Sequence, residues 1–442
     1  MPIRDGDLTP LLQLEGAALA DGLAAALPEA VRSDAACGQW AEGWRGGRAA
    51  ALDRLARIDP AAYAASRNHV GGAVSRLSPW IRHGVLGLAE VRDAALSRVA
   101  RPADAEKFVS ELWWRSYWRL VQAAIGDGID HDIEPPLTVA RAAAGATLPD
   151  DIRQAATGMP CIDDFVRRLH ATGWLHNHER MWLASWVVHV RGVPWRVGAD
   201  WFLEHLLDGD PASNHLSWQW VAGTFSAQPY YVTRGNLETF TGAAYCPECD
   251  LRGRCSIEGD HTAVANRHGR PSGAVRGRLR IPPASAWRLA VSSPRRPVVW
   301  LTLDSASTCG PAAVAHPDAP AVFVVERDWL ERERPTLKRL VFLFECLADV
   351  PGLEVHVGDA GRIVPECAAR HAADGVVVAD TPCPRVRAAA AGIDRELPVR
   401  VLDWPALAGV DRLTDLGRFS RTWHLVRDEA LRPSAAIPPT AG

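Results

Sequence analysis

Between residues 297 and 402 the chain alternates short apolar runs with longer amphipathic stretches. The runs are PVVWLTLD, APAVFVVE, GLEVHVGD, GVVVAD and PVRVLD, and helical patterns such as TLKRLVFLFECLADV separate them. Valine-rich runs without alternation are typical of parallel strands buried on both faces, which helical crossovers connect. The pattern predicts a doubly wound α/β domain. No G-x-G-x-x-G follows the first run, so nothing in this segment predicts dinucleotide binding.

Before residue 245 the apolar residues follow a helical period. Three- and four-residue spacing predicts helices over 105–123, 159–171, 176–191 and 198–207. We therefore expect an all-α domain that precedes the α/β domain. The predicted divisions are a helical domain (1–245), a cysteine segment with a linker (246–296), the α/β domain (297–405) and a C-terminal helix and tail (406–442).

The stretch from Thr157 to Trp220 is rich in tryptophan. Its rings are those of Trp174, Trp182, Trp186, Trp195, Trp201, Trp218 and Trp220. Ordinary cores use tryptophan sparingly, because the indole N–H needs a hydrogen-bond partner. Arginine and carboxylate side chains lie among these rings. The combination predicts a site for a large planar, redox-active cofactor.

The chain has 442 residues, 48% of them hydrophobic, and a formal net charge of −3. These values are typical of a globular protein of two or three domains, and they argue against a wholly basic nucleic-acid-binding protein. A local basic groove stays open as an interpretation. No apolar run reaches membrane-spanning length and the N-terminus carries no export signal, so we expect a cytoplasmic monomer that binds no membrane.

Two short stretches suggest ligand binding. Gly71-Gly72 and the segment Ser75–Pro79 place hydroxyls and a flexible backbone where a helix can begin, which suits an anion such as a pyrophosphate. The alternative is a plain helix capped by Ser78. Further on, Glu111 lies beside two tryptophans and Arg115. It is either a buried hydrogen-bonding group for a ligand or a partly exposed acid paired to Arg115.

Cysteines with metal-ligand spacing follow the helical domain. Cys246 and Cys249 form a C-x2-C turn, and Cys255 and His261 come next. The chain has nine cysteines, an odd number, which fits reduced thiols or a metal site better than a disulfide framework.

Five motifs together resemble the FAD-binding helical domain of the photolyase/cryptochrome family. They are SRLSP (75–79), ELWWR (111–115), TGMPCIDD (157–164), GWLHNHERM (173–181) and DGDPASNHLSWQW (208–220). The family normally carries its α/β antenna domain first. Here the antenna-like segment 327–359 follows the flavin domain, so the chain resembles a circular permutation. SASTCGP (305–311) replaces the usual arginine-rich loop, which leaves binding of an antenna pigment open.

The resemblance implies a bound FAD and names its ligands. Tyr63, Ser75, Arg76 and Ser78 would lie around the diphosphate. Arg180 would pair with Asp208 against the isoalloxazine ring. Asp210 and Asn214 would face the polar edge of that ring. A buried arginine–carboxylate pair suits a flavin that carries negative charge when it is reduced.

The resemblance also implies a photolyase-like lyase activity on UV-damaged DNA. In the family, a cyclobutane pyrimidine dimer flips into a pocket and excited reduced FAD donates the electron that splits it. Glu111 and Asn177 would hydrogen-bond the dimer, and the apolar walls would be Trp114, Met181 and Trp220. Met181 can equally be a core filler. A DNA groove could be lined by Arg76, Arg115, Arg119, Arg167 and Arg168, although a solvated helix face explains these arginines as well.

Electron supply in the family uses a tryptophan relay. Trp218 and Trp195 match its first two members. The third should fall near Ala142, where the sequence has no tryptophan. The relay could end at Trp186, at Trp182 or at a metal cluster, and core packing is the alternative role of both tryptophans.

A bacterial branch of the family carries a [4Fe-4S] cluster. Its ligands match Cys161, Cys246, Cys249 and Cys255 here. Zinc held by the last three and His261 is one alternative, and unliganded thiols are another. Two other functions also stay open: a cryptochrome-like light sensor without repair activity, and a flavoenzyme of different redox chemistry. The type of DNA lesion is not predicted.

Overall fold

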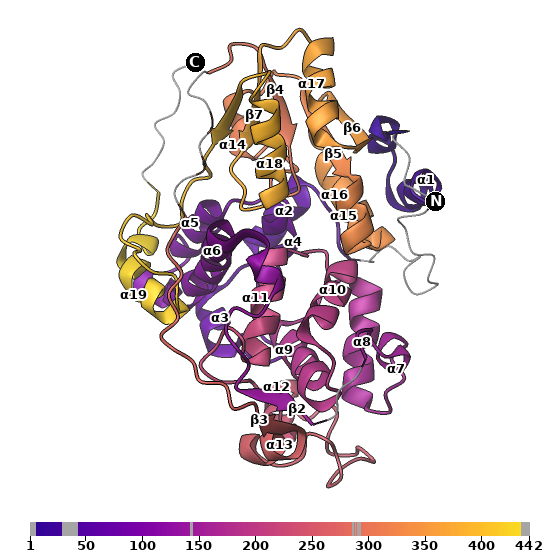
Figure 1. Ribbon diagram of the computed structural model, residues 1–442, viewed down its shortest axis with the longest axis vertical. Coiled ribbons are helices and arrows are strands. Elements are labelled where there is room, and N and C mark those ends of the chain that lie inside the picture. The colour runs from indigo at the N-terminus through magenta and orange to yellow at the C-terminus, as the bar shows by residue number, and fades with distance from the viewer. Residues whose placement is uncertain are drawn as a thin grey trace.

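The computed structural model describes residues 6–28, 43–141, 145–284, 287, 289 and 293–434. A six-stranded sheet with helices on both faces forms one end of the molecule, and a helical part forms the other (Figure 1). Within the described ranges, no helix is both long and apolar enough to cross a membrane.

Five parallel strands form the centre of the sheet, in the order β6-β5-β4-β7-β8. They are β4 (Pro297–Leu301), β5 (Ala321–Glu326), β6 (Leu353–Gly358), β7 (Gly375–Ala379) and β8 (Val399–Leu402). These are the five predicted runs, so the predicted α/β sheet is confirmed. The order reverses at β4, and a crevice opens at such a point beyond the carboxyl ends of the strands. The covering helices are α14 (Pro311–Ala315), α15 (Arg327–Glu333), α16 (Leu337–Leu347), α17 (Ala360–Arg370) and α18 (Pro384–Ile393).

The N-terminal segment packs on this sheet and not on the helical part. Strand β1 (Gly6–Asp7) pairs antiparallel with β6, and helix α1 (Gly16–Ala26) lies against α16. Leu19 and Leu23 are buried in the same core as the strands. The division at 1–245 is corrected here, because an apolar helical period predicts a buried face without naming its partner.

The helical part contains the four predicted helices, as α6 (Glu106–Ile125), α8 (Pro160–Thr172), α9 (Asn177–Ser185) and α10 (Trp195–His205). Around them lie further helices: α2 (Arg48–Ala56), α3 (Pro60–Ser66), α4 (Ser78–Arg82), α5 (Leu88–Leu96), α7 (Asp150–Arg153), α11 (Pro211–Ala222) and α12 (Arg234–Thr241). A π-helical segment, Trp186–Val190, continues α9. Such segments are frequent at functional sites. Short 3-10 turns lie at Thr9–Gln13, Pro102–Ala105 and Gly126–Asp130.

Segments late in the chain return to the helical part. Strand β3 (Gly269–Pro271) pairs with β2 (Thr138–Ala140), next to α13 (His261–His268). The predicted C-terminal helix is α19 (Phe419–Ala430), which packs on α6. The predicted tail beyond residue 434 lies outside the described residues.

Candidate functional site

The turn Asp208-Gly209-Asp210, between α10 and α11, brings four predicted flavin ligands together. Asp208 accepts two hydrogen bonds from Arg180, at 3.0 and 2.9 Å. Asp210 caps α11 by accepting a hydrogen bond from the Ser213 amide at 2.9 Å. One turn on, the Asn214 amide group donates to the Ala199 carbonyl at 2.8 Å. The turn therefore presents a fixed cation, two carboxylates and an amide.

Local hydrogen bonds fix the direction of Arg180. The Glu179 carboxylate accepts from the His176 amide at 3.0 Å and closes a capping box at the start of α9. The Nε of Arg180 donates to the Leu175 carbonyl at 2.9 Å. With both sides of the guanidinium occupied, Arg180 has one orientation relative to Asp208.

Two buried arginines donate hydrogen bonds to the backbone of this turn. The Gly209 carbonyl accepts from Arg82 Nε at 2.8 Å and from Arg339 Nη2 at 3.0 Å. A Cβ atom on residue 209 would lie 2.8 Å from the Arg339 guanidinium carbon, so the close approach requires glycine. Arg339 belongs to α16, so the α/β part supports the turn directly. Sequence reasoning missed both arginines, and the one available signal was a charge inside the apolar run of α16.

A buried carboxylate joins the two parts of the molecule. Asp304 follows β4 and pairs with Arg82 and with Arg119, whose Nη1 lies 3.0 Å from Oδ1. Thr381, beyond β7, donates its hydroxyl to the same carboxylate. Although burial opposes ionisation, the two guanidinium groups hold the pKa of Asp304 far below its usual range.

Arg115 also forms an ion pair in the interior. Its Nη1 lies 2.9 Å from Asp210 Oδ2. Despite complete burial of Asp210, Arg115 and its neighbours lower the pKa of that carboxyl. Arg115 and Arg119 are thus engaged in ion pairs with interior carboxylates, so neither is a freely solvated cation.

A small cavity of about 80 Å³ gathers the predicted diphosphate ligands Tyr63 and Ser75 with Arg54 and Arg57. Burial and the nearby charges of Arg76 and Arg57 lower the pKa of Arg54. Clustered cations of this kind favour an anionic ligand. Sequence reasoning missed Arg54, because only the fold brings α2 beside the segment that contains Ser75.

The other two diphosphate candidates lie just beyond this cavity. Arg76 has a left-handed backbone with a φ of 55°, and its guanidinium lies 5.0 Å from the Trp174 ring centre. Ser78 is the first residue of α4. It does not cap the helix, since Leu77 occupies the cap position and no side chain caps it.

Glu111 pairs with Lys107 at 2.7 Å and with Arg67 at 3.4 Å. The predicted alternative, a pair with Arg115, is wrong because Arg115 reaches Asp210. Burial, followed by the charge of Arg67, lowers the pKa of His178 to about 4, while Glu111 opposes the shift. Glu111 on α6 therefore approaches the start of α9.

The remaining predicted substrate residues lie on α6, α9 and α11. Asn177 is exposed at the start of α9, and its Nδ2 lies 3.4 Å from the sulfur of Met181. The half-buried Trp220 ring packs near Tyr230, with ring centres 5.9 Å apart. Phe419 of α19 stacks on Trp114 at 3.6 Å with an angle of 3° between the planes. The C-terminal helix thus covers one face of Trp114.

The predicted relay tryptophans lie in the core between α10 and α11. Trp218 lies over Gly198, where a Cβ would come within 2.3 Å of the ring. Trp195 donates its indole N–H to Asp132 at 2.6 Å. Trp186 donates to the Ser256 hydroxyl at 3.3 Å, next to Cys255. Trp182 is fully buried and donates to Asn236 at 2.7 Å. Ala142 lies outside the described residues.

The four predicted cluster cysteines line one small cavity of about 20 Å³. Burial and the neighbouring thiols raise the pKa of Cys161 to about 12, and burial chiefly raises that of Cys246 to about 11. His261 is turned elsewhere, since its Nε2 accepts from the Tyr231 amide at 3.2 Å. Within the described ranges, one group of three metal-ligating atoms lies within 4.8 Å of one another, and it belongs to Glu354, Cys367 and His371. No three sulfurs of the four cysteines are therefore that close together.

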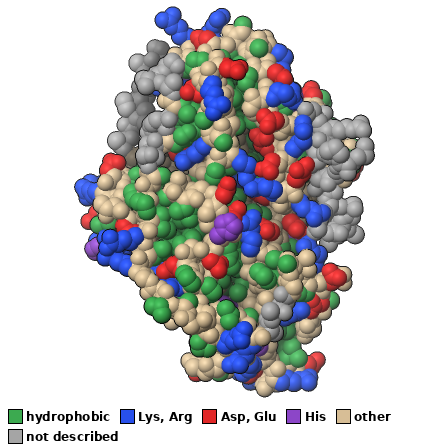
Figure 2. Space-filling model, viewed as in Figure 1, with side chains coloured by type: hydrophobic (Ala, Val, Ile, Leu, Met, Phe, Trp, Pro, Cys, Tyr) green, Lys and Arg blue, Asp and Glu red, His purple; other side chains and the backbone are tan. Residues whose placement is uncertain are grey.

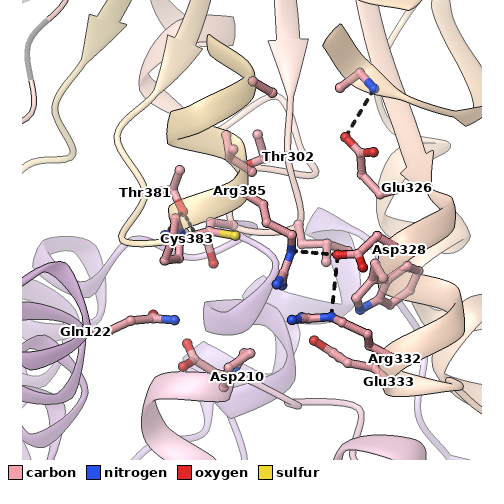
Figure 3. Close-up of a pocket in the computed structure, with 18 of the residues that line it drawn as sticks. Gln122, Asp210, Thr302, Glu326, Asp328, Arg332, Glu333, Thr381, Cys383 and Arg385 are labelled. Atoms are coloured by element: carbon pink, nitrogen blue, oxygen red, sulfur yellow. Dashed lines mark hydrogen bonds and ion pairs between the residues drawn. The ribbon is translucent and has the colours of Figure 1, made fainter. Parts of the chain in front are cut away.

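A larger cavity, of about 340 Å³, separates the sheet from the helical part. Figure 3 shows Thr302, Thr381 and Cys383 entering it from the sheet side and Gln122 and Asp210 from the helical side. Acidic and basic side chains also gather on the surface at this boundary, over α15 and α10 (Figure 2).

Charged groups dominate the wall that α15 and β5 contribute to this cavity. Asp328 pairs with Arg332 at 3.5 Å and with Arg385 at 3.1 Å. Burial, and then the charge of Asp359, raises the pKa of Glu326 to about 7. Asp210 lines this cavity and also belongs to the turn Asp208–Asp210. The cavity is therefore a second candidate ligand site, next to the predicted flavin site.

Residues 108–251 match the family described as the FAD binding domain of DNA photolyase. Over 154 residues the chain is 39% identical to a deoxyribodipyrimidine photo-lyase of Streptomyces griseus, covering 35% of this chain and 33% of the relative. Over 190 residues it is 34% identical to a chloroplastic/mitochondrial cryptochrome DASH of Oryza sativa subsp. japonica, covering 40% and 32%. A bacterial class III photolyase from Agrobacterium tumefaciens gives a TM-score of 0.37 at 28% identity, covering 48% of this chain and 46% of that one.

The matched region spans about a third of the length of these curated relatives. It lies within the helical part and includes the turn at Asp208–Asp210. The family-model match and the two curated relatives thus place the similarity to the FAD-binding domain of DNA photolyase in the helical part.

Proposed function

We propose, from the match of residues 108–251 to the FAD-binding domain of DNA photolyase, that this protein is a light-driven, flavin-dependent enzyme that splits cyclobutane pyrimidine dimers in UV-damaged DNA. The observation that carries the proposal is the bidentate pair of Arg180 and Asp208 on a turn that also presents Asp210 and Asn214.

The donor set fits FAD at both of its ends. Arg54, Arg57, Tyr63 and Ser75 supply cations and hydroxyls for the diphosphate. Arg180 would face the isoalloxazine ring, with its charge balanced by Asp208. When bound and reduced, FAD supplies the light-excited electron. The protein's part is to hold the ring, exclude water from it and keep the positive charge of Arg180 in place.

Substrate would enter between α6 and α9. Glu111 and Asn177 would orient the flipped dimer by hydrogen bonds, and Met181, Trp114 and Trp220 would give it apolar walls. Trp218 and Trp195 would carry electrons that restore the reduced flavin. The bond from Trp186 to Ser256, beside Cys255, supports a route that ends near the cysteines.

The test is blue-light repair of an oligonucleotide that contains a cyclobutane dimer, by the reduced, flavin-loaded protein. We expect repair, and we expect Glu111→Gln to lower its rate by roughly tenfold or more, because a hydrogen bond to a charged group contributes about 1.5–3 kcal/mol. Glu106→Gln, on the same helix but at its first residue, should repair like the wild type. A flavin-loaded protein that repairs no dimer would remove the proposal.

A second candidate is a cryptochrome-like light sensor without repair activity. The flat stack of Phe419 on Trp114 favours it, since this contact covers one face of a proposed pocket wall. The same assay separates the two functions. Photoreduction of the flavin by light without any dimer repair, in the wild type and in Phe419→Ala, would select the sensor.

We also propose that Cys161, Cys246, Cys249 and Cys255 hold a [4Fe-4S] cluster. They line one cavity, and their sulfurs do not group within 4.8 Å. A single zinc ion would hold thiolates about 3.8 Å apart, whereas a four-iron cluster keeps them farther apart. The orientation of His261 toward Tyr231 also argues against the zinc alternative.

Replacing Cys161 by serine should remove most of the protein-bound iron and acid-labile sulfide, because a four-iron cluster needs all four thiolates. Iron and sulfide would be measured on anaerobically purified protein. Cys346→Ser removes a buried thiol elsewhere, on α16, and should leave the iron content unchanged. Wild-type iron content in Cys161→Ser would reject the ligand assignment.

The order of the parts supports a further proposal, that the chain is a circular permutation of the usual family arrangement. All five parallel strands come from residues 297–402, after the helical part. The N-terminal segment returns to the same sheet through β1.

A further inference from the structure

Four metal-ligating side chains meet at the edge of the α/β part, far along the sheet from the sites described above. Glu354 and His356 are alternate residues of β6 and therefore point to the same face of the sheet. Cys367 and His371 lie one helical turn apart, at the end of α17, which follows β6 directly. Strand β6 pairs with β1 of the N-terminal segment and lies beside it in Figure 1.

The ligating atoms are already close together. Those of Glu354, Cys367 and His371 all lie within 4.8 Å of one another. His371 Nε2 is 2.6 Å from Glu354 Oε1, and His356 Nε2 is 3.1 Å from Oε2. A tetrahedral ion with bonds of about 2.0–2.3 Å holds its ligating atoms roughly 3.3–3.8 Å apart. Small side-chain rotations would therefore bring Glu354, Cys367 and His371 around one ion, while His356 lies outside this group and contacts Glu354.

The surroundings resemble those of built metal sites. Arg370 forms an ion pair with Glu354, and Asp7 Oδ1 on β1 lies 4.0 Å from the other ring nitrogen of His356. Metal-ligating histidines and carboxylates commonly have such outer partners, which fix their orientation. Cys367 is buried, whereas the His371 side chain is 38% exposed, so an ion can reach the site from solvent.

We propose that Glu354, Cys367 and His371 form a binding site for a zinc ion, with His356 in hydrogen-bond contact with Glu354 beside it. One sulfur, one imidazole nitrogen and one carboxylate oxygen suit zinc, whereas magnesium and calcium prefer oxygen ligands alone. The thiolate and the carboxylate balance the charge of the ion. Three protein ligands leave the fourth position to water, and the ion would tie α17 to β6 next to the N-terminal strand.

The test counts zinc on the full chain after treatment with a chelator and dialysis against zinc chloride. Cys367→Ser and His371→Ala should each bind about one zinc ion fewer than the wild type, because each removes one of the three protein ligands. Cys346→Ser, a buried thiol on α16, should bind as much zinc as the wild type. His371 is exposed, so His371→Ala should keep the fold, which circular dichroism would verify.

Cobalt separates this site from the cysteines at residues 161–255. In a chain with Cys246→Ser and Cys249→Ser, added cobalt chloride should give the visible bands of tetrahedral, thiolate-bound cobalt, and these should vanish when Cys367→Ser is added. A folded His371→Ala protein with the zinc content of the wild type, or a cobalt spectrum that does not respond to Cys367→Ser, would overturn the proposal.

Discussion

Replacing Asp304 by alanine is expected to lower the free energy of unfolding by about 3–5 kcal/mol, the usual cost of removing one partner from a buried ion pair. The Asp304 side chain is 10% exposed, and the Arg82 and Arg119 side chains that face it are 5% and 19% exposed. Without the carboxylate, Arg82 loses its ion-pair partner in the interior, and Arg119 keeps only the longer contact to Asp210, at 3.8 Å. Thr381 loses its acceptor as well.

Chemical denaturation of the wild type and Asp304→Ala from pH 8 downward would measure this effect. The folded-state pKa of Asp304 lies below its unfolded value of about 4, so its contribution is complete above that value and is lost as the pH falls through the folded-state pKa. The difference between the two proteins should stay constant from pH 8 to about 5 and shrink below about 4. Asp53→Ala breaks an exposed pair with Arg57 and should change little. An Asp304→Ala protein as stable as the wild type at pH 7 would contradict the importance of this network.

The strands of the α/β part could be predicted because strands that are buried on both faces have uninterrupted apolar sequences. Val298 and Val376 are both buried, and a strand covered on both faces buries its side chains on either face. Such a strand can therefore be predicted without knowing which element packs on it. An amphipathic helix carries less information. The helical period of the apolar residues before residue 245 includes α1, but it could not indicate that α16, more than 300 residues later, covers this helix.

The residues of the candidate site also differ in whether the sequence could predict them. The pairing of Arg180 with Asp208 was expected from the resemblance, and the structure contains that pair. Arg339 could not be foreseen as its support, because the contact spans 130 residues of sequence and depends on how α16 meets the turn. Phe419 is a similar case, since its stack on Trp114 arises only when α19 folds back on α6. Ligand motifs are local, whereas the groups that hold or cover them come from elsewhere in the chain.

Arg180→Ala should weaken retention of FAD by roughly 30-fold or more, because it removes the cation that would face the isoalloxazine ring, and losing one partner of a buried charged contact costs about 2–5 kcal/mol. The side chain of Asp208 is 6% exposed, so water cannot replace the lost guanidinium. Flavin content after gel filtration and a fluorescence titration with added FAD would measure the effect.

The chain offers a matched control in Arg191, which also makes two hydrogen bonds to one carboxylate, Asp151, at 2.8 and 3.0 Å. That pair lies apart from the flavin-ligand turn, so Arg191→Ala should retain FAD like the wild type. Adding Asp208→Ala to Arg180→Ala removes the unpaired charge and should recover thermal stability without recovering FAD. If the double variant regained FAD, or if Arg191→Ala lost it equally, Arg180 would act through the fold alone and not as a flavin ligand.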